Sequence, residues 1–281
     1  MPAFEARPGM PYWVDMSTKD LRKSTYFYSK VLGWKVGAHT DSTSAADAEN
    51  HAENDAESDY IVARLEGLPV AGFIQQPQEA SSTDTWVTQF LSADITADCG
   101  RVEELGGRVL SPATEVSLGQ MALCADNADG LFGLIQPAGE DSFVAAGEPG
   151  TPVWHEYTAT GHFDQVADFY RGLFNWETAT QDGYSLVLED GAAFAGLWDA
   201  TDQFPNEVPG FWQSYLGVRD IDEASRLVTE FGGEVIRGPE RSSFGPLLLV
   251  SDATGATVTF CETPEPVPEE DLSEADSILN L

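Results

Sequence analysis

One stretch of this 281-residue chain occurs twice, and this repeat limits what the chain can fold into. The first copy spans residues 9–34 and the second spans residues 150–176. Trp13 and Trp154 are 141 residues apart, and one inserted residue near Gly161 lengthens the spacing to 142 for the aromatic residues that follow. A repeat of this size indicates that the fold is built from related units.

A second repeat lies between the copies of the first. Residues 86–130 begin with a tryptophan, carry a Gly-Gly pair and end in an Asp-rich turn closed by glycine, and residues 212–255 follow the same plan. The order along the chain is therefore A-B-A′-B′, which predicts four units in two related pairs.

Each unit is predicted to run strand, helix, strand, strand, strand. Alternating strand formers, helix-capping aspartates and Gly-Gly stops mark the boundaries. We expect helices at 20–31, 95–105, 163–173 and 221–231. We expect strands at 12–18, 34–39, 60–65, 70–76, 86–92, 108–111, 119–125, 131–136, 153–159, 176–181, 184–189, 192–198, 212–218, 234–237, 246–251 and 256–261.

The repeat divides the chain into two domains, at 9–138 and 150–264, each large enough to bury a core. Residues 41–59 hold seven acids, no base and no aromatic residue, so we expect a disordered insertion. The acidic tail at 265–281 is expected to hang free, apart from a short helix near 271–279.

The net charge of −33 bears on the partners of the chain. All four lysines lie between Lys19 and Lys35, so no basic stripe is available for phosphates or anionic lipid. We therefore expect no nucleic-acid and no membrane partner, and a monomer or homodimer. The three cysteines form no short-spaced pair and the N-terminus resembles no secretory signal, which together favour the cytoplasm.

Four such units in two pairs resemble the vicinal oxygen chelate superfamily, which groups glyoxalases, bleomycin resistance proteins and extradiol dioxygenases. The chain is most similar to tandem two-domain, actinobacterial glyoxalase-like proteins. The resemblance implies an α+β fold in which two β-α-β-β-β units form one U-shaped mixed sheet with outer helices and an inner cavity. It rests on Trp13-Val-Asp-Met-Ser-Thr, Phe27-Tyr28, Gly33-Trp34, Asp220-Ile-Asp, Phe231-Gly-Gly and Asp252-Ala-Thr-Gly255-Ala.

In metal-dependent members of that superfamily, histidines on first strands and glutamates on last strands hold the metal. The matching positions here are Trp13, Val87, Trp154 and Gln213 on the first strands, and Gly133 and Val258 on the last strands. None is a histidine or a carboxylate, and a divalent metal needs several converging ligands. We therefore expect no metal and no other cofactor. His155 alternates away from the cavity and is expected to face the helices.

Strand alternation predicts what does line the cavities. The inward residues, and thus the candidate ligand-binding residues, are Trp13, Asp15, Gln89, Trp154, Glu156, Gln213 and Tyr215. Asp15 and Glu156 are either solvated at an open mouth or hydrogen-bonded to a neighbour, and either could act as a general base. Trp13 and Trp154 line a pocket or simply fill a closed cavity.

Three functions remain open from the sequence. The first is metal-independent binding of a small aromatic or amphipathic molecule, as in sequestration or resistance, and the excess of acidic residues favours a cationic guest. The second is an isomerase, lyase or dioxygenase of the superfamily that uses the cavity carboxylates or an atypical metal site. The third is a structural or interaction protein whose cavities are filled by side chains.

Overall fold

A computed structural model describes residues 6–37, 60–77, 83–116, 118–138, 146–205, 207–242 and 244–263. These residues form two eight-stranded sheets and four helices. The predicted disordered segment at 41–59 and the whole of the predicted tail at 265–281 lie outside the described residues.

The first sheet holds the elements of the first two units. They are β1 (Pro11–Thr18), α1 (Leu21–Val31), β2 (Lys35–Gly37), β3 (Tyr60–Leu65), β4 (Leu68–Gln75), β5 (Thr85–Leu91), α2 (Ile95–Glu104), β6 (Arg108–Val116), β7 (Gly119–Ala125) and β8 (Leu131–Pro137).

The second sheet repeats this plan with the last two units. They are β9 (Pro152–Ala159), α3 (Phe163–Phe174), β10 (Glu177–Gln181), β11 (Tyr184–Glu189), β12 (Ala192–Asp199), β13 (Phe211–Val218), α4 (Ile221–Glu230), β14 (Glu234–Ser242), β15 (Gly245–Ser251) and β16 (Thr257–Glu262).

Both sheets have the same strand order. The first reads β2-β3-β4-β1-β5-β8-β7-β6, and the second reads β10-β11-β12-β9-β13-β16-β15-β14. In each, the first strands of the two units pair antiparallel at the centre, and each pairs in parallel with the last strand of its own unit. The predicted α+β architecture of four β-α-β-β-β units, paired into two glyoxalase-like domains, is confirmed.

The helices begin where the aspartates predict. Asp20, Asp94 and Asp220 each accept a hydrogen bond from a backbone N–H three residues on, which satisfies one of the free donors of a helix start. In α3 the N-cap is the exposed His162, which has left-handed backbone angles and forms no capping side-chain bond. None of these four helices is long and apolar enough to cross a membrane.

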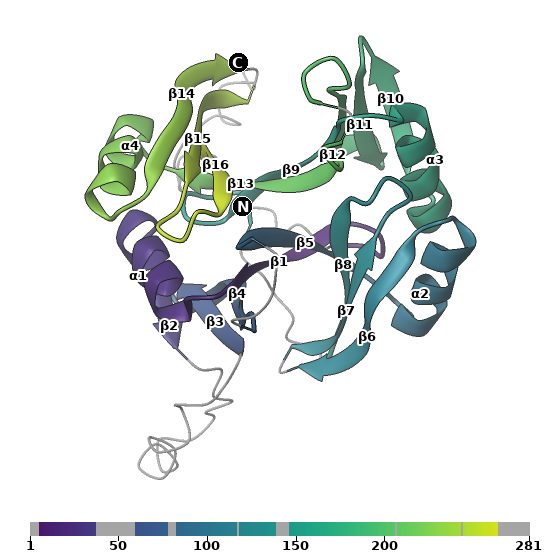
Figure 1. Ribbon diagram of the computed structural model, residues 1–281, viewed down its shortest axis with the longest axis horizontal. Helices are drawn as coiled ribbons and strands as arrows, with labels where there is room; N and C mark the ends of the chain where they lie inside the picture. Colours follow the sequence, from purple (N-terminus) through teal and green to yellow (C-terminus); the bar gives the residue numbers. More distant parts are fainter. Residues whose placement is uncertain are drawn as a thin grey trace, which may run out of the picture.

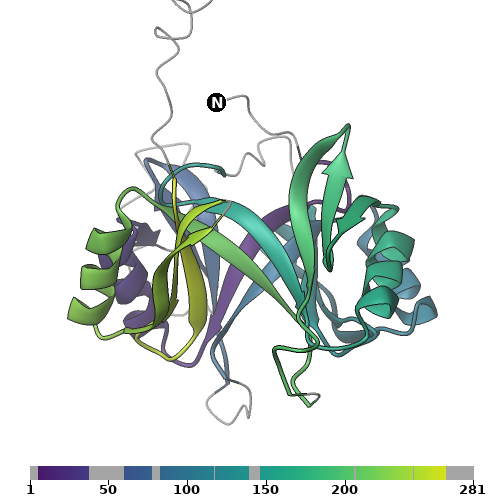
Figure 2. The ribbon, with the colours of Figure 1, turned by 90° about the horizontal axis from the view of Figure 1, so that it is seen from above.

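The two domains share their cores. One buried cluster joins α2 of the first domain to α3 of the second, and the other joins α1 to α4. The helices lie on the outer side of each U, as the fold predicts, and the two sheets meet back to back between the helix pairs (Figures 1 and 2). We expected each half to bury a core of its own, but each core takes residues from both halves.

The edge strands β6 and β14 extend well beyond the predicted 108–111 and 234–237. The predicted strands end one residue before Pro112 and two residues before Pro239. In the structure each proline lies within a register shift of its strand. Because an edge strand leaves one row of backbone groups without a partner strand, it tolerates a missing N–H there.

Candidate functional site

The concave face of the first sheet holds a carboxylate surrounded by donors. Nε1 of Trp13 lies 3.0 Å from Oδ1 of Asp15, and the hydroxyl of Tyr60 donates to the same oxygen at 2.8 Å. Nε2 of Gln89 donates to Oδ2 at 2.8 Å. The Trp13 N–H also lies 2.9 Å from the Tyr60 hydroxyl, so β1, β3 and β5 converge on one buried group.

Burial governs the chemistry of Asp15. Its side chain is fully buried, and desolvation raises its pKa from 3.8 to about 6, although the bonds from Tyr60, Trp13 and Gln89 act in the opposite direction. Of the two environments that the sequence left open for this carboxylate, the structure has the hydrogen-bonded one.

Two glycines make room for this cluster. A β-carbon at Gly72 on β4 would lie 2.1 Å from Oδ1 of Asp15 and 2.3 Å from the Tyr60 hydroxyl. A β-carbon at Gly133 on β8 would lie 1.7 Å from Oε1 of Gln89. The Gln89 amide therefore occupies the space above one of the positions where metal-dependent relatives would carry a carboxylate. Its Oε1 is buried without a hydrogen-bond partner among the described residues.

The second sheet repeats the arrangement with a glutamate. The hydroxyl of Tyr184 on β11 donates to Oε2 of Glu156 at 2.7 Å, and the hydroxyl of Tyr215 on β13 donates to Oε1 at 2.8 Å. Burial raises the pKa of Glu156, while these two bonds lower it. Gly196 again lies under the tyrosine, because a β-carbon there would fall 2.0 Å from the Tyr184 hydroxyl.

Gln213 completes the polar floor of this second cup, the concave face of the second sheet. Its Nε2 lies 3.4 Å from the hydroxyl of Thr158, and its Oε1 accepts a bond of 3.1 Å from Thr259. Both threonines are buried. The predicted register on the last strand was wrong here: Thr259, not Val258, pairs with Tyr215 and matches Gly133, while Val258 packs in the core behind the sheet. The turns before β8 and β16 have the same length, since Asp126 pairs with Gly130 and Asp252 pairs with Ala256 in the same way. The glycine of the second turn, Gly255, lies one residue earlier than Gly130 does in the first, and this shifts a count that starts from the glycine.

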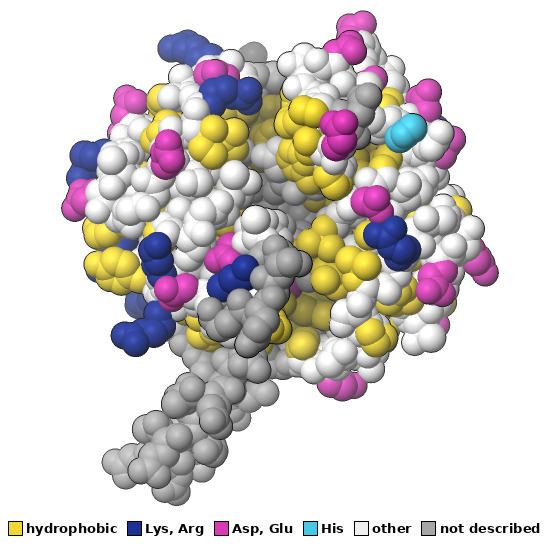
Figure 3. Space-filling model, in the orientation of Figure 1, with side chains coloured by type: hydrophobic (Ala, Val, Ile, Leu, Met, Phe, Trp, Pro, Cys, Tyr) yellow, Lys and Arg dark blue, Asp and Glu magenta, His cyan; other side chains and the backbone are white. Residues whose placement is uncertain are grey.

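The first cup, which is the concave face of the first sheet, and the second cup differ in how exposed their tryptophans are. Trp13 is 2% exposed and packs with Val62, Met121 and Ile135 in a closed cluster. Trp154 is partly exposed and packs against Phe244, with ring centroids 5.0 Å apart and planes at 32°. Phe244 itself is 39% exposed. In Figure 3 the molecule is hollowed between the arms of the second sheet, and hydrophobic side chains gather along that hollow.

The structure places the predicted inward residues in two groups. Trp13, Asp15 and Gln89 meet in the first cup, and Glu156 and Tyr215 meet in the second with Gln213 and Trp154 nearby on the same face. The sequence reading missed Tyr60, Tyr184 and Phe244. A tyrosine opens the third strand in both halves, and that repeat was the available signal.

His155 faces away from the second cup, as strand alternation predicts. Its Nδ1 lies 2.8 Å from the hydroxyl of Ser214, which in turn lies 3.0 Å from the hydroxyl of Thr88 on β5. Desolvation lowers the pKa of His155 to about 3, so the imidazole is neutral at physiological pH. This chain of polar groups joins the two sheets behind the cups.

No metal-ligand cluster is found among the described residues. No group of three or more histidine, cysteine, aspartate or glutamate side chains converges there on one point. The first-strand positions matched to metal ligands carry Trp13, Val87, Trp154 and Gln213. The donor set of each cup is one carboxylate with tyrosine hydroxyls and amides, which does not fit a site of the histidine-and-glutamate type.

The chain is similar in sequence to known proteins. Residues 12–131 match the sequence model of the Glyoxalase/Bleomycin resistance protein/Dioxygenase superfamily. The chain is 26% identical to "Putative glyoxylase CFP32" of Mycobacterium tuberculosis over 95% of this chain and 98% of the relative. It is also 26% identical to "Anthracycline biosynthesis protein DnrV" of Streptomyces peucetius, over 93% of this chain and 96% of that protein.

Solved structures resemble the fold at low sequence identity. The 2,3-dioxygenase LapB from Pseudomonas sp. KL28 superposes with a TM-score of 0.58 at 12% identity, over 94% of this chain and 96% of that one. A Mn(II)-bound glyoxalase from Novosphingobium aromaticivorans superposes with a TM-score of 0.57 at 14% identity, over 94% of this chain and 89% of that one. These likenesses concern the two-domain fold.

Proposed function

Because the chain belongs to the glyoxalase/bleomycin resistance protein/dioxygenase superfamily, we propose that it binds a small aromatic or amphipathic molecule without a metal, as a sequestration or resistance protein does. The binding site in this proposal is the second cup. The observation that carries it is the partly exposed Trp154 and Phe244 pair on the same concave face as the carboxylate of Glu156.

The chemistry of the second cup suits an aromatic guest. Trp154 and Phe244 offer an aromatic wall, against which a planar ring system can stack. The floor offers Glu156, held between two tyrosine hydroxyls, and the Gln213 amide. A mostly apolar hollow with a few fixed polar groups is typical of a small-molecule site. The printed name of the Streptomyces relative concerns anthracycline biosynthesis, which favours a polycyclic aromatic guest.

The first cup has another role in this proposal. Its tryptophan, carboxylate and amide satisfy one another almost completely, and the indole is closed off by apolar neighbours. We assign this cluster to the stability of the first domain. The expectation that Trp13, Asp15 and Gln89 bind a ligand therefore gives way to the filled-cavity alternative in this half.

Calorimetric titration of the purified full chain with a hydroxyanthraquinone tests the proposal. We expect binding that persists after EDTA treatment and that Trp154→Ala or Phe244→Ala weakens at least ten-fold. Phe244→Ala is the milder change, because its ring is already 39% exposed. Trp13→Ala is the matched control: it should cost about 3–5 kcal/mol of stability and leave the affinity of the folded fraction unchanged.

Two results would contradict the proposal. One is a binder whose affinity is unchanged in the Trp154, Phe244 and Glu156→Gln variants. The other is a stoichiometric metal in the purified protein whose removal abolishes binding.

A second candidate function is proton abstraction from a carbon acid. It is favoured by the raised pKa of Glu156, which makes a carboxylate a stronger base when it ionises. The mycobacterial relative carries the name "Putative glyoxylase CFP32", which is the name of an enzyme. Exchange of a guest's carbon-bound proton with deuterated solvent, followed by NMR, would reveal it. Loss of exchange in Glu156→Gln with binding intact would assign the role of base.

A further inference from the structure

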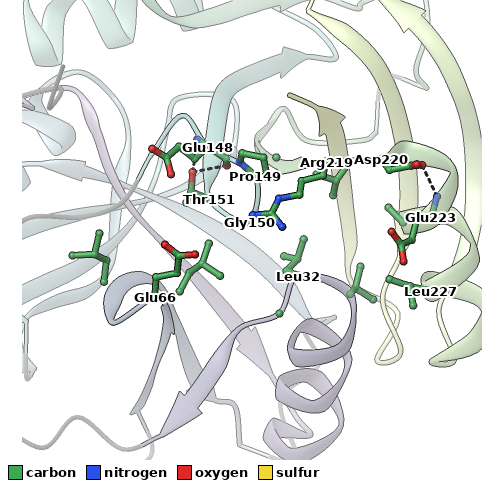
Figure 4. A pocket seen from close by; sticks show the side chains of 17 residues that line it. Leu32, Glu66, Glu148, Pro149, Gly150, Thr151, Arg219, Asp220, Glu223 and Leu227 are labelled. Atoms are coloured by element: carbon green, nitrogen blue, oxygen red, sulfur yellow. Dashed lines mark hydrogen bonds between the residues drawn. The ribbon is translucent and has the colours of Figure 1, made fainter. Parts of the chain in front are cut away.

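A hollow separate from both cups lies between the domains. It has a volume of about 540 Å³ and is formed by the end of α1, the turn between β3 and β4, the segment before β9 and the start of α4 (Figure 4). Its apolar lining comes from both domains: Val31, Leu32, Leu65, Leu68, Val218, Ala224 and Leu227. We call this hollow the interdomain groove.

Acidic side chains outnumber basic ones in the interdomain groove. Glu66, Glu148 and Glu223 line it, and Arg219 reaches into it from the end of β13 (Figure 4). Asp220 also lines the groove, but its carboxylate caps α4. Glu223 also lies 3.6 Å from a guanidinium nitrogen of Arg226 on α4, so the negative charge of the interdomain groove comes mainly from Glu66 and Glu148. The carbonyl end of α1 faces the same space, and the helix dipole adds partial negative charge there.

Because of the internal repeat, the molecule has a pseudo-symmetric equivalent of the interdomain groove. Nε1 of Trp34 donates to the carbonyl of Gly150 at 2.7 Å, and Nε1 of Trp176 donates to the carbonyl of Gly9 at 2.9 Å. These bonds align the segment before β9 with the segment before β1. Glu148-Pro149-Gly150 therefore corresponds to Arg7-Pro8-Gly9.

In the second copy the chain itself supplies a cation. Arg7 forms an ion pair of 2.9 Å with Asp190, in the turn between β11 and β12, and another with Glu189, the last residue of β11. The equivalent of Asp190 in the interdomain groove is Glu66, at the same position of the β3–β4 turn before a glycine. Arg7 and Asp190, which form an ion pair in one copy, thus correspond to Glu148 and Glu66 in the interdomain groove. The groove has two carboxylates where the other copy has an arginine and a carboxylate.

We propose that the interdomain groove binds an organic cation, with a guanidinium or ammonium head and an apolar body. The head takes the place that the guanidinium of Arg7 takes in the other copy, between Glu66 and Glu148. A planar guanidinium matches carboxylates through paired hydrogen bonds. The body lies on the apolar floor near Leu32 and Leu227, where its burial adds to the affinity. This site is independent of the second cup.

The test uses 4-phenylbutylguanidinium as the probe, with 4-phenylbutylurea as its uncharged isostere. Calorimetric titration of the full chain should detect the guanidinium compound binding at one site, more weakly as salt rises, and should detect much weaker binding of the urea. Glu66→Gln and Glu148→Gln should each weaken binding up to about five-fold, the range of a solvent-exposed ion pair. Glu148→Arg places a guanidinium of the chain in the head position and should abolish binding.

Matched variants separate this site from the others. Glu189→Gln lies in the copy that Arg7 occupies and should leave the affinity unchanged. Trp154→Ala should also leave it unchanged, because the second cup is a different site. The proposal is overturned if the urea binds as tightly as the guanidinium, if Glu148→Arg binds normally, or if Trp154→Ala alone abolishes binding. Thermal melts of every variant confirm that the chain is folded.

Discussion

The hydroxyl of Tyr170 on α3 donates a hydrogen bond of 2.9 Å to Oδ2 of Asp126, which belongs to the other domain. Oδ1 of Asp126 accepts the N–H groups of Ala128 and Gly130 and so shapes the turn before β8. Nε1 of Trp212 lies 2.8 Å from the same tyrosine oxygen. The Asp-rich turn that marks the repeat in the sequence thus anchors a helix of the partner domain.

The pseudo-symmetric position repeats the tryptophan–tyrosine bond and the turn around an aspartate. Nε1 of Trp86 donates to the hydroxyl of Tyr28 at 2.8 Å. Burial raises the pKa of Tyr28, and the charge of the neighbouring Asp252 raises it further. Oδ1 of Asp252 accepts the N–H groups of Thr254 and Ala256. The two turns therefore hold the two shared cores together from opposite sides.

The first prediction concerns the stability of this interdomain contact. Tyr170→Phe removes the hydroxyl between Asp126 and Trp212 and leaves both buried groups without that partner. We expect a loss of about 1–3 kcal/mol in the free energy of unfolding, measured by urea denaturation. Tyr26→Phe is the control, because Tyr26 is 54% exposed, and it should change stability by less than about 0.5 kcal/mol. Equal effects of the two changes would contradict the interdomain role.

The second prediction concerns pH. Because the pKa of Asp15 is raised from 3.8 to about 6, the folded protein holds this proton more tightly than the unfolded chain does. The contribution of Asp15 to stability is therefore fully present below about pH 4, falls as pH rises, and is lost above about pH 6. The fall should be on the order of 3 kcal/mol.

Asp15→Asn isolates this contribution. The other buried carboxyls with raised pKa values, at Asp126, Glu156 and Asp252, remain in the variant and cancel in the comparison. Urea midpoints from pH 4 to 7 should therefore fall more steeply for the wild type than for the variant. Parallel curves would show that Asp15 titrates at its ordinary pKa in the folded protein.

Sequence alternation predicted the faces of the strands correctly. Val14 and Met16 pack in the shared core, while Trp13 and Asp15 lie in the cup, because the period of two is a local property of a strand. Strand pairing is not local. Tyr60 reaches Asp15 only because β3 pairs with β4 beside β1, and no local pattern records that contact.

The sharing of cores was equally invisible in the sequence. The apolar face of α1, with Ser24, Phe27, Tyr28 and Val31 buried, is explained equally well by packing on its own sheet or on the other domain. The structure has it packed on both, in one cluster with α4. Helix patterns predict which face is buried but not what covers it.

The third prediction concerns Gly196, which lies under the Tyr184 ring. Gly196→Ala would bring a β-carbon within 2.0 Å of the Tyr184 hydroxyl and displace its bond to Glu156. We expect a destabilisation of about 1–3 kcal/mol and a weaker affinity of the second cup for aromatic guests. Gly100→Ala in α2 is the control, since no atom lies within 4 Å of its β-carbon. That change should stabilise the protein by up to about 1 kcal/mol.

The last prediction concerns salt. The chain carries 47 acidic and 14 basic residues, so most pairs of charges on its surface repel each other. Ion pairs such as Arg108 with Asp129 are exposed and contribute little, so screening them costs little. At 0.15 M salt the screening length is about 8 Å, which weakens the repulsion between separated acids. Thermal melts should therefore shift upward from 0.01 M to 0.5 M NaCl. A melting temperature that falls steadily over this range would show that attractive pairs dominate the surface.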